Sequence, residues 1–588
     1  MKTLRGIAAS RGIAIGSAFH FLRTDLRFDR CTVENPAVEW ARFQTALAMA
    51  REQLSDVSTK AEAEAGAEQA AIFQAHTMML EDPELLGAVR TIIEEQCVNA
   101  ESALGDAADM YVQLLESLDD EYLRARAADV RDVVERILCI LLGVAESPTT
   151  ELSTPSIILA RDLKPSDTLL LDKSLVLGFC TAEGGPTTHT AILARGLGIP
   201  AVVGVGPELL EVLGGTTLIL DGSDGILVVE PDEETLDTYR ERQVTINKVL
   251  AHARKQAHEP AITCDGHRVE VVANVGSVEG ARTALEAGAE GIGLLRTEFL
   301  YLKQSSLPDE DRQYRAYRAI ADVFGDQPVI LRTLDIGGDK NLPYLDLPQE
   351  ANPFLGLRAI RLCLVRPELL RPQLRAALRA GVGRNFKLMF PMAATVAEVR
   401  AARAVLDECR AELLAEGQPA AEKMEVGIMV EVPAAALMAD RLAAEVDFFS
   451  IGTNDLSQYT LAADRTNAQV AHLATGFHPA VLRLVRDVIS AAHAQGKWVG
   501  LCGELAGEPL AVPILLGLGL DEFSMNPPVI PLVKQIIRAL TLDEAREIAQ
   551  SALELDSPDA VRTLVRERLA GLGDTLTIDA TPGTGTRP

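Results

Sequence analysis

The strongest constraint on the fold is a strand–helix rhythm that repeats eight times between residues 262 and 540. Each short apolar run is typical of a buried strand, and each is followed by residues with the three- and four-residue spacing of a helix. The expected strands are 269–273, 291–295, 329–331, 387–390, 426–430, 448–451, 498–501 and 522–524. Eight such units in this length are typical of a (β/α)8 TIM barrel. We therefore predict a barrel over residues 261–572.

The rest of the chain predicts a smaller α/β domain with a helical insertion. Residues 148–230 alternate short strands and helices, and the β-like residues 1–20 are expected to pack with them. Residues 36–145 differ, because they are rich in Ala, Glu and Leu and have helical spacing, which predicts four helices. We therefore assign 21–147 to an inserted four-helix subdomain. Such an insert favours docking of a partner protein, with plain structural packing as the alternative.

A helix and a tail complete the predicted architecture, which is of the multidomain α/β class. Acidic residues open a helix at Pro231, and Pro260 ends it. Its polar sequence shows little apolar face, so residues 231–260 are interpreted as a linker helix between domains that move. Residues 573–588 are rich in Gly, Pro and Thr and are expected to form a flexible tail.

The charge of the chain excludes some classes of partner. The formal net charge is −28, which repels nucleic acid and anionic membranes and attracts a basic protein. An anionic substrate would therefore need a local cluster of arginines. There is no apolar run of about 18 residues and no signal-peptide core. The eight cysteines form no CxxC pair, which argues against a zinc site or a disulfide framework. We expect a cytoplasmic protein.

One histidine stands where a glycine-rich turn becomes a helix. Residues 183–188 follow an apolar strand and lead into a helical segment that begins at His189. The free N–H groups of a first helical turn favour an anion. A histidine there could carry a phosphoryl group covalently, as a nucleophile. The alternative is a helix N-terminus that merely contains a partly exposed histidine.

Unusual polar residues follow the predicted barrel strands, at the end where barrel enzymes place their active sites. They are Arg296, Arg332, Lys340, Glu431, Asn454, Asp455 and Cys502, with Arg358 and Arg465 in the segments that follow. Guanidinium groups suit a phosphate and a carboxylate, whereas Glu431 and Asp455 offer the oxygen ligands that Mg²⁺ takes. Any one arginine alone would more often form a surface salt bridge. The set as a whole predicts one convergent site.

Two motifs resemble a known family. Gly184-Gly-x-Thr-x-His-x-Ala-Ile-x-Ala-Arg195, followed by Gly-Ile-Pro-Ala-Val-Val-Gly204, resembles the phosphohistidine signature of phosphoenolpyruvate-utilising enzymes. From about residue 5 to about residue 570 the chain resembles the enzyme I proteins of the bacterial phosphoenolpyruvate:sugar phosphotransferase system. One departure is Pro186, where relatives often carry a basic or another side chain. That departure concerns a charge at position 186 and leaves the implied role of His189 intact.

The resemblance implies a reaction and roles for its residues. Phosphoenolpyruvate would phosphorylate His189, which then passes the group to a histidine of the carrier protein HPr and so begins sugar uptake. The motif Gly500-Leu-Cys-Gly-Glu-Leu-Ala-Gly507 implies that Cys502 donates the proton that completes pyruvate. Composition alone would equally allow a buried, inert cysteine. Segments 352–361 and 447–459 resemble the substrate loop, which carries Arg358, and the signature that holds Asn454 and Asp455.

The resemblance also implies partners. HPr would dock on the helical subdomain, where Met78 and Met79 offer adaptable apolar contacts and Glu68, Asp82 and Glu84 offer negative charge. Ordinary packing within a helical hairpin is the alternative for the methionines. The family further implies a homodimer through the barrel.

Two other functions could use the same fold. A dikinase or synthase that makes phosphoenolpyruvate with ATP needs a nucleotide-binding domain, and the 180 residues before the histidine contain no glycine-rich nucleotide loop. A phospho-signalling paralogue could keep the fold and lose turnover, although every expected position is filled. Self-labelling from phosphoenolpyruvate without ATP would discriminate between these functions.

Overall fold

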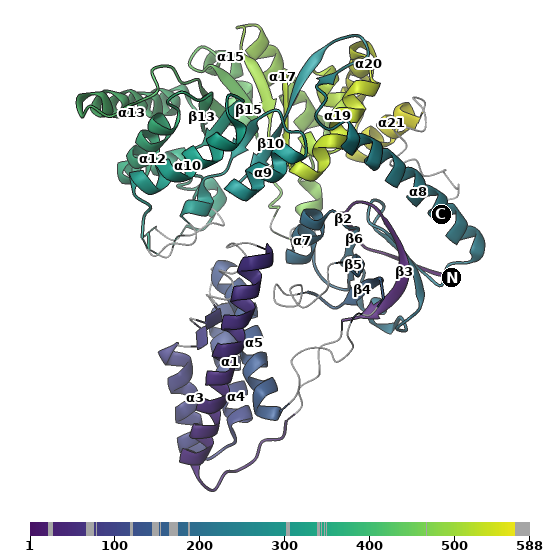
Figure 1. Cartoon of the computed structure of the whole chain (residues 1–588), viewed down its shortest axis with the longest axis vertical. Helices are drawn as coiled ribbons and strands as arrows, with labels where there is room; N and C mark the ends of the chain where they lie inside the picture. Colours follow the sequence, from purple (N-terminus) through teal and green to yellow (C-terminus); the bar gives the residue numbers. More distant parts are fainter. Residues whose placement is uncertain are drawn as a thin grey trace. The chain divides into compact units, whose positions relative to one another are not determined.

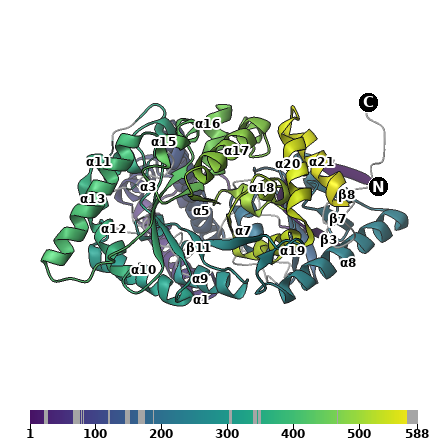
Figure 2. The same cartoon turned by 90° about the horizontal axis from the view of Figure 1, so that it is seen from above.

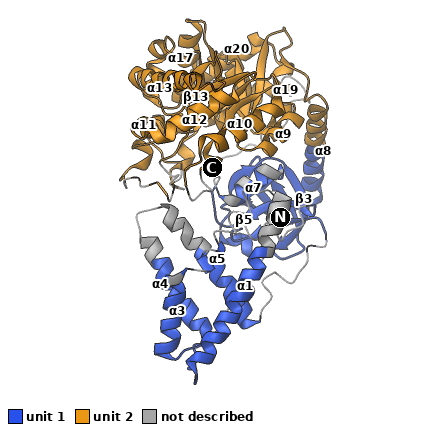
Figure 3. Ribbon diagram, turned by 60° about the vertical axis from the view of Figure 1, so that its left-hand side comes forward, with its two compact units in different colours: residues 1–243 blue, residues 244–588 orange. Residues whose placement is uncertain are grey.

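The computed structural model describes residues 1–21, 28–65, 76–77, 79–80, 82–117, 121–143, 152, 154–163, 174–185, 188–301, 306–337, 342, 344–345, 347, 350–465, 467 and 469–570. The chain divides into two compact units, residues 1–243 and residues 244–588 (Figure 3). No described helix is both long and apolar enough to cross a membrane.

A mixed sheet forms the α/β part of the first unit. Its strand order is β1-β8-β7-β3-β4-β5-β6-β2. The strands are β1 (Lys2–Arg5), β2 (Ile7–Ser10), β3 (Ile13–His20), β4 (Ser156–Ala160), β5 (Val176–Thr181), β6 (Ala201–Val203), β7 (Thr217–Asp221) and β8 (Ile226–Val229). Residues 2–20 therefore supply three strands. Strand β4 is buried throughout, and its alternating side chains enter two separate apolar clusters. Helix α7 (His189–Leu197) and the 3₁₀ helix η1 (Pro207–Glu211) complete this part.

Among the described residues of the first unit, four long helices form a separate group and lie side by side in Figure 1. They are α1 (Pro36–Ala65), α3 (Pro83–Gln96), α4 (Ala100–Ser117) and α5 (Glu121–Leu142). The helical spacing in the sequence is explained by one shared core, in which Phe43, Ala50, Val133 and Ile137 are almost completely buried. The predicted helical block is confirmed, although the boundaries that we assign to the subdomain stay a proposal.

The second unit contains a closed barrel of eight parallel strands, as predicted. Strands β10 to β17 pair in sequence order, and pairing of β17 with β10 closes the cylinder. The strands are β10 (Arg268–Val275), β11 (Ile292–Leu295), β12 (Val329–Arg332), β13 (Phe386–Phe390), β14 (Val426–Val430), β15 (Phe448–Ile451), β16 (Trp498–Leu501) and β17 (Glu522–Met525). A short strand, β9 (Ala261–Ile262), pairs antiparallel with β10.

The helices of this unit surround the strands (Figure 2). They are α9 (Val278–Glu286), α10 (Glu310–Phe324), α11 (Ile360–Val365), α12 (Pro367–Ala380), α13 (Val396–Ala415), α14 (Pro433–Leu437), α15 (Ala439–Leu442), α16 (Thr453–Leu461), α17 (Pro479–His493), α18 (Val512–Gly517), α19 (Ile530–Ala539), α20 (Leu542–Leu553) and α21 (Pro558–Ala570). Short 3₁₀ turns are η2 (Glu298–Leu300), η3 (Pro353–Leu355), η4 (Ala471–Leu473), η5 (Glu504–Gly507) and η6 (Pro527–Val529).

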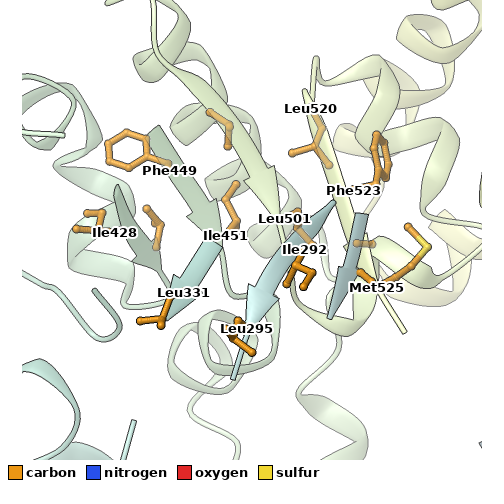
Figure 4. Packing of buried hydrophobic residues seen from close by; sticks show 14 of the residues in the cluster. Ile292, Leu295, Leu331, Ile428, Phe449, Ile451, Leu501, Leu520, Phe523 and Met525 are labelled. Carbon is orange, nitrogen blue, oxygen red and sulfur yellow. The ribbon is translucent and has the colours of Figure 1, made fainter. Parts of the chain in front are cut away.

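Two apolar layers hold the barrel together. Side chains such as Leu331, Ile451 and Leu501 belong to a large cluster that also includes residues of the surrounding helices (Figure 4). A smaller cluster fills the interior and contains Leu294, Ile330, Met389, Met429, Phe448 and Cys502. This alternation places every second residue of a strand inside the barrel.

Helix α8 (Glu233–Lys255) differs from the prediction in its second half. The first half is polar, and Gln243 donates a hydrogen bond from Nε2 to the carbonyl of Ile13 at 2.8 Å. The second half buries Val249 and Ala253, and Val249 joins the core of the barrel unit. The expectation of a helix with little apolar face is therefore wrong for this half. Its role as a linker stays a prediction.

Candidate active site

The candidate site lies where the barrel strands end. Arg332 is the last residue of β12, Glu431 directly follows β14, and Cys502 directly follows β16. Asp455 lies in the first turn of α16, which begins two residues after the end of β15. Because parallel strands all point their carboxyl ends the same way, the barrel brings these residues to one rim.

Arg332 is buried and held by two carboxylates. Its guanidinium donates a hydrogen bond to Glu298 Oε1 at 2.8 Å and forms an ion pair with Asp335 Oδ2 at 3.2 Å. Burial alone would lower the pKa of this guanidinium, but Glu298 and Asp335 raise it. Its Nε is buried without a hydrogen-bond partner among the described residues. One donor of a permanently charged group is thus left for an anion.

Arg358 is the most enclosed cation of the site, with a relative exposure of 1 %. Its Nε and one terminal nitrogen donate to the two oxygens of Asp335 at 2.9 and 3.1 Å, and the other terminal nitrogen donates to Asp455 Oδ1 at 3.1 Å. Asp335 therefore joins Arg332 to Arg358. Sequence reasoning missed Asp335, although its position three residues after Arg332, in the same strand-end segment, was an available signal.

Behind this rim, a buried polar network supports the end of β12. Gln373 of α12 is fully buried; it accepts a hydrogen bond from the N–H of Leu334 at 2.8 Å and donates to Thr297 and Tyr317. Thr297 in turn donates to the carbonyl of Arg332 at 3.1 Å. Because these bonds satisfy groups that water cannot reach, they fix the backbone from which Arg332 projects.

Glu431 and Asp455 form the acidic part of the site. Glu431 is almost completely buried and accepts a hydrogen bond from the N–H of Met392 at 2.7 Å. Burial, followed by the negative charges of Asp455 and Asp335, raises its pKa to about 8. Arg465 Nη1 lies 3.4 Å from Asp455 Oδ2. In the part of the chain that the structure describes, no group of three or more His, Cys, Asp or Glu side chains is arranged to hold a metal ion.

This acidic pair nevertheless fits one kind of cation. Mg²⁺ usually takes only one or two protein carboxylates and completes its shell with water and substrate phosphate oxygens. The buried like charges around Glu431 would also be relieved by a cation. The chemistry of the donor set therefore fits a Mg²⁺ ion that a phosphorylated substrate helps to hold.

Cys502 is buried, with a relative exposure of 4 %, and belongs to the interior cluster of the barrel. Its Sγ lies 3.8 Å from the carbonyl oxygen of Ile451, and Asn274 Nδ2 donates to its carbonyl at 3.0 Å. Burial raises the pKa of the Cys502 thiol to about 11. The thiol therefore keeps its proton at neutral pH, which suits a proton donor better than a nucleophile.

The remaining predicted barrel residues fall into three cases. Arg296, directly after β11, is exposed and has no ion pair with the described residues, so it is free to bind an anion. Asn454 accepts a hydrogen bond from the N–H of Glu504 at 2.9 Å, which ties the segment after β15 to η5. Lys340 lies outside the described residues.

The turn before His189 is shaped by glycine. Gly184 has a φ of +106°, and a Cβ there would lie 3.2 Å from Thr188 Cγ2. The Thr188 hydroxyl donates to the carbonyl of Gly185 at 2.8 Å and does not cap the helix. Helix α7 therefore begins at His189 without a side-chain cap from Thr188, so its first N–H groups can meet an anion. The side chain of His189 lies outside the described part.

The described residues among those proposed to dock HPr differ in their surroundings. Asp82 caps α3, since its Oδ1 accepts from the N–H groups of Glu84 and Leu85, and its Oδ2 accepts from the Tyr111 hydroxyl at 2.9 Å. Glu84 is exposed, whereas Met79 packs against the helical core. Glu68 and Met78 lie outside the described part of the chain.

Comparison with known proteins identifies the class. Three family models match: the PEP-utilising enzyme N-terminal domain over residues 5–126, the mobile domain over 152–225 and the PEP-binding domain over 250–542. The barrel rim with its cations, carboxylates and thiol lies within the last of these. The fold and the site therefore define a phosphoenolpyruvate-utilising enzyme.

Full-length relatives narrow the class further. A phosphoenolpyruvate-protein phosphotransferase of Bacillus sp. (strain S) is 49 % identical over 565 residues, which cover 96 % of this chain and 98 % of the relative. Those of Staphylococcus carnosus and Bacillus subtilis are each 47 % identical over 567 residues, covering 96 % of this chain and 99 % and 100 % of the relatives. The chain belongs to the phosphoenolpyruvate-protein phosphotransferases, the enzyme I family.

Proposed function

We propose that this protein transfers the phosphoryl group of phosphoenolpyruvate to its own His189 and then to a histidine of the carrier protein HPr, releasing pyruvate. This would be the first step of sugar uptake by the phosphotransferase system. The observation that carries the proposal is the rim of the barrel, where two buried arginines, four buried carboxylates and a protonated thiol converge. Phosphoenolpyruvate presents a phosphate, a carboxylate and a carbon that needs a proton, and these groups match that rim.

The cations bind and orient the substrate. Arg332, through its unpartnered Nε, and the exposed Arg296 provide donors for the phosphate and the carboxylate. Arg358 and Arg465, which both contact Asp455, add to this positive charge. Lys340 and Asn454 complete the proposed set of substrate contacts. Held in this way, the transferring group has its charge neutralised by fixed cations, which is the main source of catalysis in phosphoryl transfer.

A metal ion belongs to this site. The family needs a divalent metal, and we propose Mg²⁺, held by Glu431 and Asp455. When bound, it would neutralise charge on the phosphoryl oxygens. Asp455 also pairs with Arg358 at 3.1 Å, so this carboxylate would help to position both the cation and the anion.

The chemical step uses one nucleophile and one acid. A ring nitrogen of His189 attacks phosphorus, the P–N bond forms, and the bond between phosphorus and the enol oxygen breaks. The electron pair of that bond leaves with the enolate of pyruvate. Cys502 then gives its proton to carbon 3 of the enolate, forming a C–H bond and leaving a thiolate. The high pKa of the thiol ensures that the proton is present beforehand.

The second half of the reaction needs a different surface. His189 cannot face phosphoenolpyruvate and HPr at the same time, so we propose that the α/β part moves, with α8 as the linker. HPr would dock on the helical subdomain near Glu68, Met78, Met79, Asp82 and Glu84. A homodimer formed through the barrel and a cytoplasmic location complete the proposal.

Pyruvate release tests this function. With phosphoenolpyruvate, Mg²⁺ and no nucleotide, the protein alone should release about one pyruvate per chain, because phosphorylated His189 blocks a second turnover. Addition of HPr should make release continuous. No pyruvate in either experiment would support a catalytically silent phospho-signalling paralogue instead, and a requirement for ATP would support a dikinase.

A further inference from the structure

Two buried polar atoms inside the barrel have no hydrogen-bond partner among the described residues. They are the Ser450 hydroxyl oxygen on β15 and Glu522 Oε1 on β17. Ser450 is fully buried and Glu522 has a relative exposure of 3 %. A buried polar atom that lacks a partner costs about 1–3 kcal/mol. The presence of two such atoms near each other therefore calls for a shared physical explanation.

Strand register places these atoms at one level on either side of a glycine. Gly500 on β16 pairs with Ser450 on one side and with Glu522 on the other. It alternates with Trp498 and Cys502, which belong to the interior cluster, so it too faces the inside. A Cβ on Gly500 would lie only 2.7 Å from Glu522 Oε1. The carboxyl therefore occupies the space above the glycine.

The gap between the two atoms suits a water molecule. Adjacent strands lie about 4.8 Å apart, so the Cα atoms of Ser450 and Glu522 are separated by about 10 Å. The Glu522 carboxyl extends over Gly500, the residue between the two strands, and shortens that distance to roughly the span of one bridging water. A water there would have two polar partners that otherwise have none.

The same serine lies next to the proposed proton donor. Ser450 lies close to the Cys502 sulfur. As a hydrogen-bond donor it lowers the pKa of the thiol, against the larger rise that burial causes. The geometry stops short of a formed hydrogen bond, because the sulfur is instead 3.8 Å from the carbonyl of Ile451. A small movement of the Ser450 hydroxyl would complete the contact when the sulfur becomes a thiolate.

We propose that Glu522, one water molecule and Ser450 form a proton relay that returns a proton to Cys502 after each turnover. The inference rests on the proposed function, in which Cys502 gives its proton to carbon 3 of pyruvate. The thiolate takes a proton from the Ser450 hydroxyl, the hydroxyl takes one from the water, and the water takes one from the Glu522 carboxylic acid. An S–H bond forms and the O–H bond of Glu522 breaks, so one proton moves and no electrons are exchanged.

The acidities of the two ends give this relay a direction. Burial, followed by the charges of Glu270 and Asp521, raises the pKa of Glu522 to about 8, with Lys387 acting in opposition. The pKa of the Cys502 thiol is higher, at about 11, so a proton moves downhill from the carboxylic acid to the thiolate.

The surroundings of Glu522 support its role as a proton source. Lys387 on β13 pairs with Glu425 at 2.8 Å and lies 4.5 Å above the Trp498 ring, so it is not committed to Glu522. Glu270, opposite Glu522 on β10, is exposed. Solvent at the floor of the barrel can therefore recharge the carboxyl without passing through a substrate-filled active site.

Glu522→Gln tests the relay, because the amide keeps the shape of the side chain but cannot supply the proton. The first turnover, followed as phosphorylation of His189 by rapid quench, should match wild type, since Cys502 starts protonated. Steady-state turnover with HPr should fall by about tenfold or more, which is less than the 10²–10⁴-fold contribution of a direct acid. Ser450→Ala should likewise leave the first turnover unchanged and slow steady-state turnover. Glu286→Gln, which changes an exposed carboxylate on α9 that does not act on Glu522, is the matched control.

The pH profile supplies a readout that a merely structural role would not change. Wild-type steady-state turnover should decline as pH rises through about 8, because the protonated form of Glu522 is lost. Glu522→Gln should lack this decline. Equal melting temperatures would show that the variants are folded.

Three results would overturn the relay. The first is a steady-state turnover rate in Glu522→Gln that equals that of wild type. The second is a normal steady-state rate in Ser450→Ala when the rate in Glu522→Gln is reduced. The third needs no turnover: the infrared carbonyl band of a protonated carboxylic acid should be present at neutral pH and absent from Glu522→Gln, and no such band in wild type excludes Glu522 as the proton source. Absence of any His189 phosphorylation would count against the proposed function, while the infrared result would still decide the relay.

Discussion

At the scale of single residues, Asp335 is the connection on which the geometry of the site depends. Its two oxygens bind Arg358, and one of them also pairs with Arg332. Neither arginine can turn away without leaving a buried charge short of a partner. Both guanidinium groups are therefore held in place before any substrate arrives, which reduces the cost of organising the site during catalysis.

Replacing this carboxylate should damage both stability and substrate binding. In Asp335→Asn, one partner of a buried ion pair is lost, which typically costs about 3–5 kcal/mol. We expect a lower melting temperature and a drop in kcat/KM for phosphoenolpyruvate of about 10²-fold. Asp326→Asn, an exposed aspartate outside the site, should change neither. An unaltered kcat/KM in Asp335→Asn would mean that the arginines do not depend on this bridge.

The proton donor can be tested by comparing two buried cysteines. Cys502→Ala should lower the rate of pyruvate formation in a single turnover by about 10²–10⁴-fold, whereas Cys409→Ala, on α13, should not lower it. Because burial raises the pKa of Cys502 to about 11, the wild-type single-turnover rate should keep its donor through neutral pH and lose it only as pH approaches that value. Equal pyruvate rates in the two variants would exclude Cys502 as the donor.

At the scale of elements, the segment between β5 and α7 shows how backbone shape would prepare the site proposed for a phosphoryl group. Gly184 adopts a φ of +106°, a region that other residues avoid, and so directs the chain toward Thr188. Gly204 approaches it closely, since a Cβ on Gly204 would lie 2.9 Å from the carbonyl of Gly184. Gly184 is thus constrained both by its own conformation and by Gly204, shortly before α7 begins at the proposed nucleophile.

A Cβ added at Gly184 tests whether the positive φ of this residue matters for phosphorylation of His189. Gly184→Ala places a Cβ against Thr188 in a strained conformation, at a cost of about 1–3 kcal/mol. We expect slower phosphorylation of His189 by phosphoenolpyruvate and a less stable first unit. Gly185→Ala is the control, because a Cβ there meets no described atom within 4 Å. Phosphorylation at the same rate in both variants would show that the positive φ is unimportant.

Much of the element scale could be predicted from sequence, for physical reasons that also explain the failures. The eight barrel strands were readable because strands buried on both sides are continuous apolar runs, and strand ends are where polar residues must appear. Asp335 could not be assigned in this way, since its importance comes from Arg358, which is distant in sequence. The apolar face of α8 did have a signal in the sequence, because Ile246, Val249 and Ala253 recur at helical spacing in its second half, but the polar composition of the helix as a whole obscured it.

The helical subdomain illustrates a second limit of sequence reasoning. Acidic residues near Pro83 favoured a docking surface, but Asp82 is also an ordinary helix cap, bonded to α3 and to Tyr111. A carboxylate can serve either role, and the pattern of residues does not distinguish a cap from a contact. Of the two described acids, the exposed Glu84 is the better candidate for a contact with HPr.

At the scale of the whole molecule, net charge should affect the two half-reactions in opposite ways. A protein with a formal charge of −28 repels phosphoenolpyruvate and attracts a basic carrier. Added salt should therefore raise kcat/KM for phosphoenolpyruvate in autophosphorylation and lower the association rate of HPr, because it screens both interactions. Stopped-flow measurements of each half-reaction over a range of salt concentrations would check this. Salt dependence of the same sign in both would contradict the electrostatic account.

The account as a whole depends on one covalent event, in which phosphoenolpyruvate alone phosphorylates His189. Intact mass spectrometry after mixing the protein with phosphoenolpyruvate and Mg²⁺, without ATP, measures that event directly. The account predicts a single added phosphoryl group that is labile in acid and absent from His189→Ala. No added mass, under conditions where phosphoenolpyruvate demonstrably binds, would contradict the account and leave the barrel with a binding or signalling role.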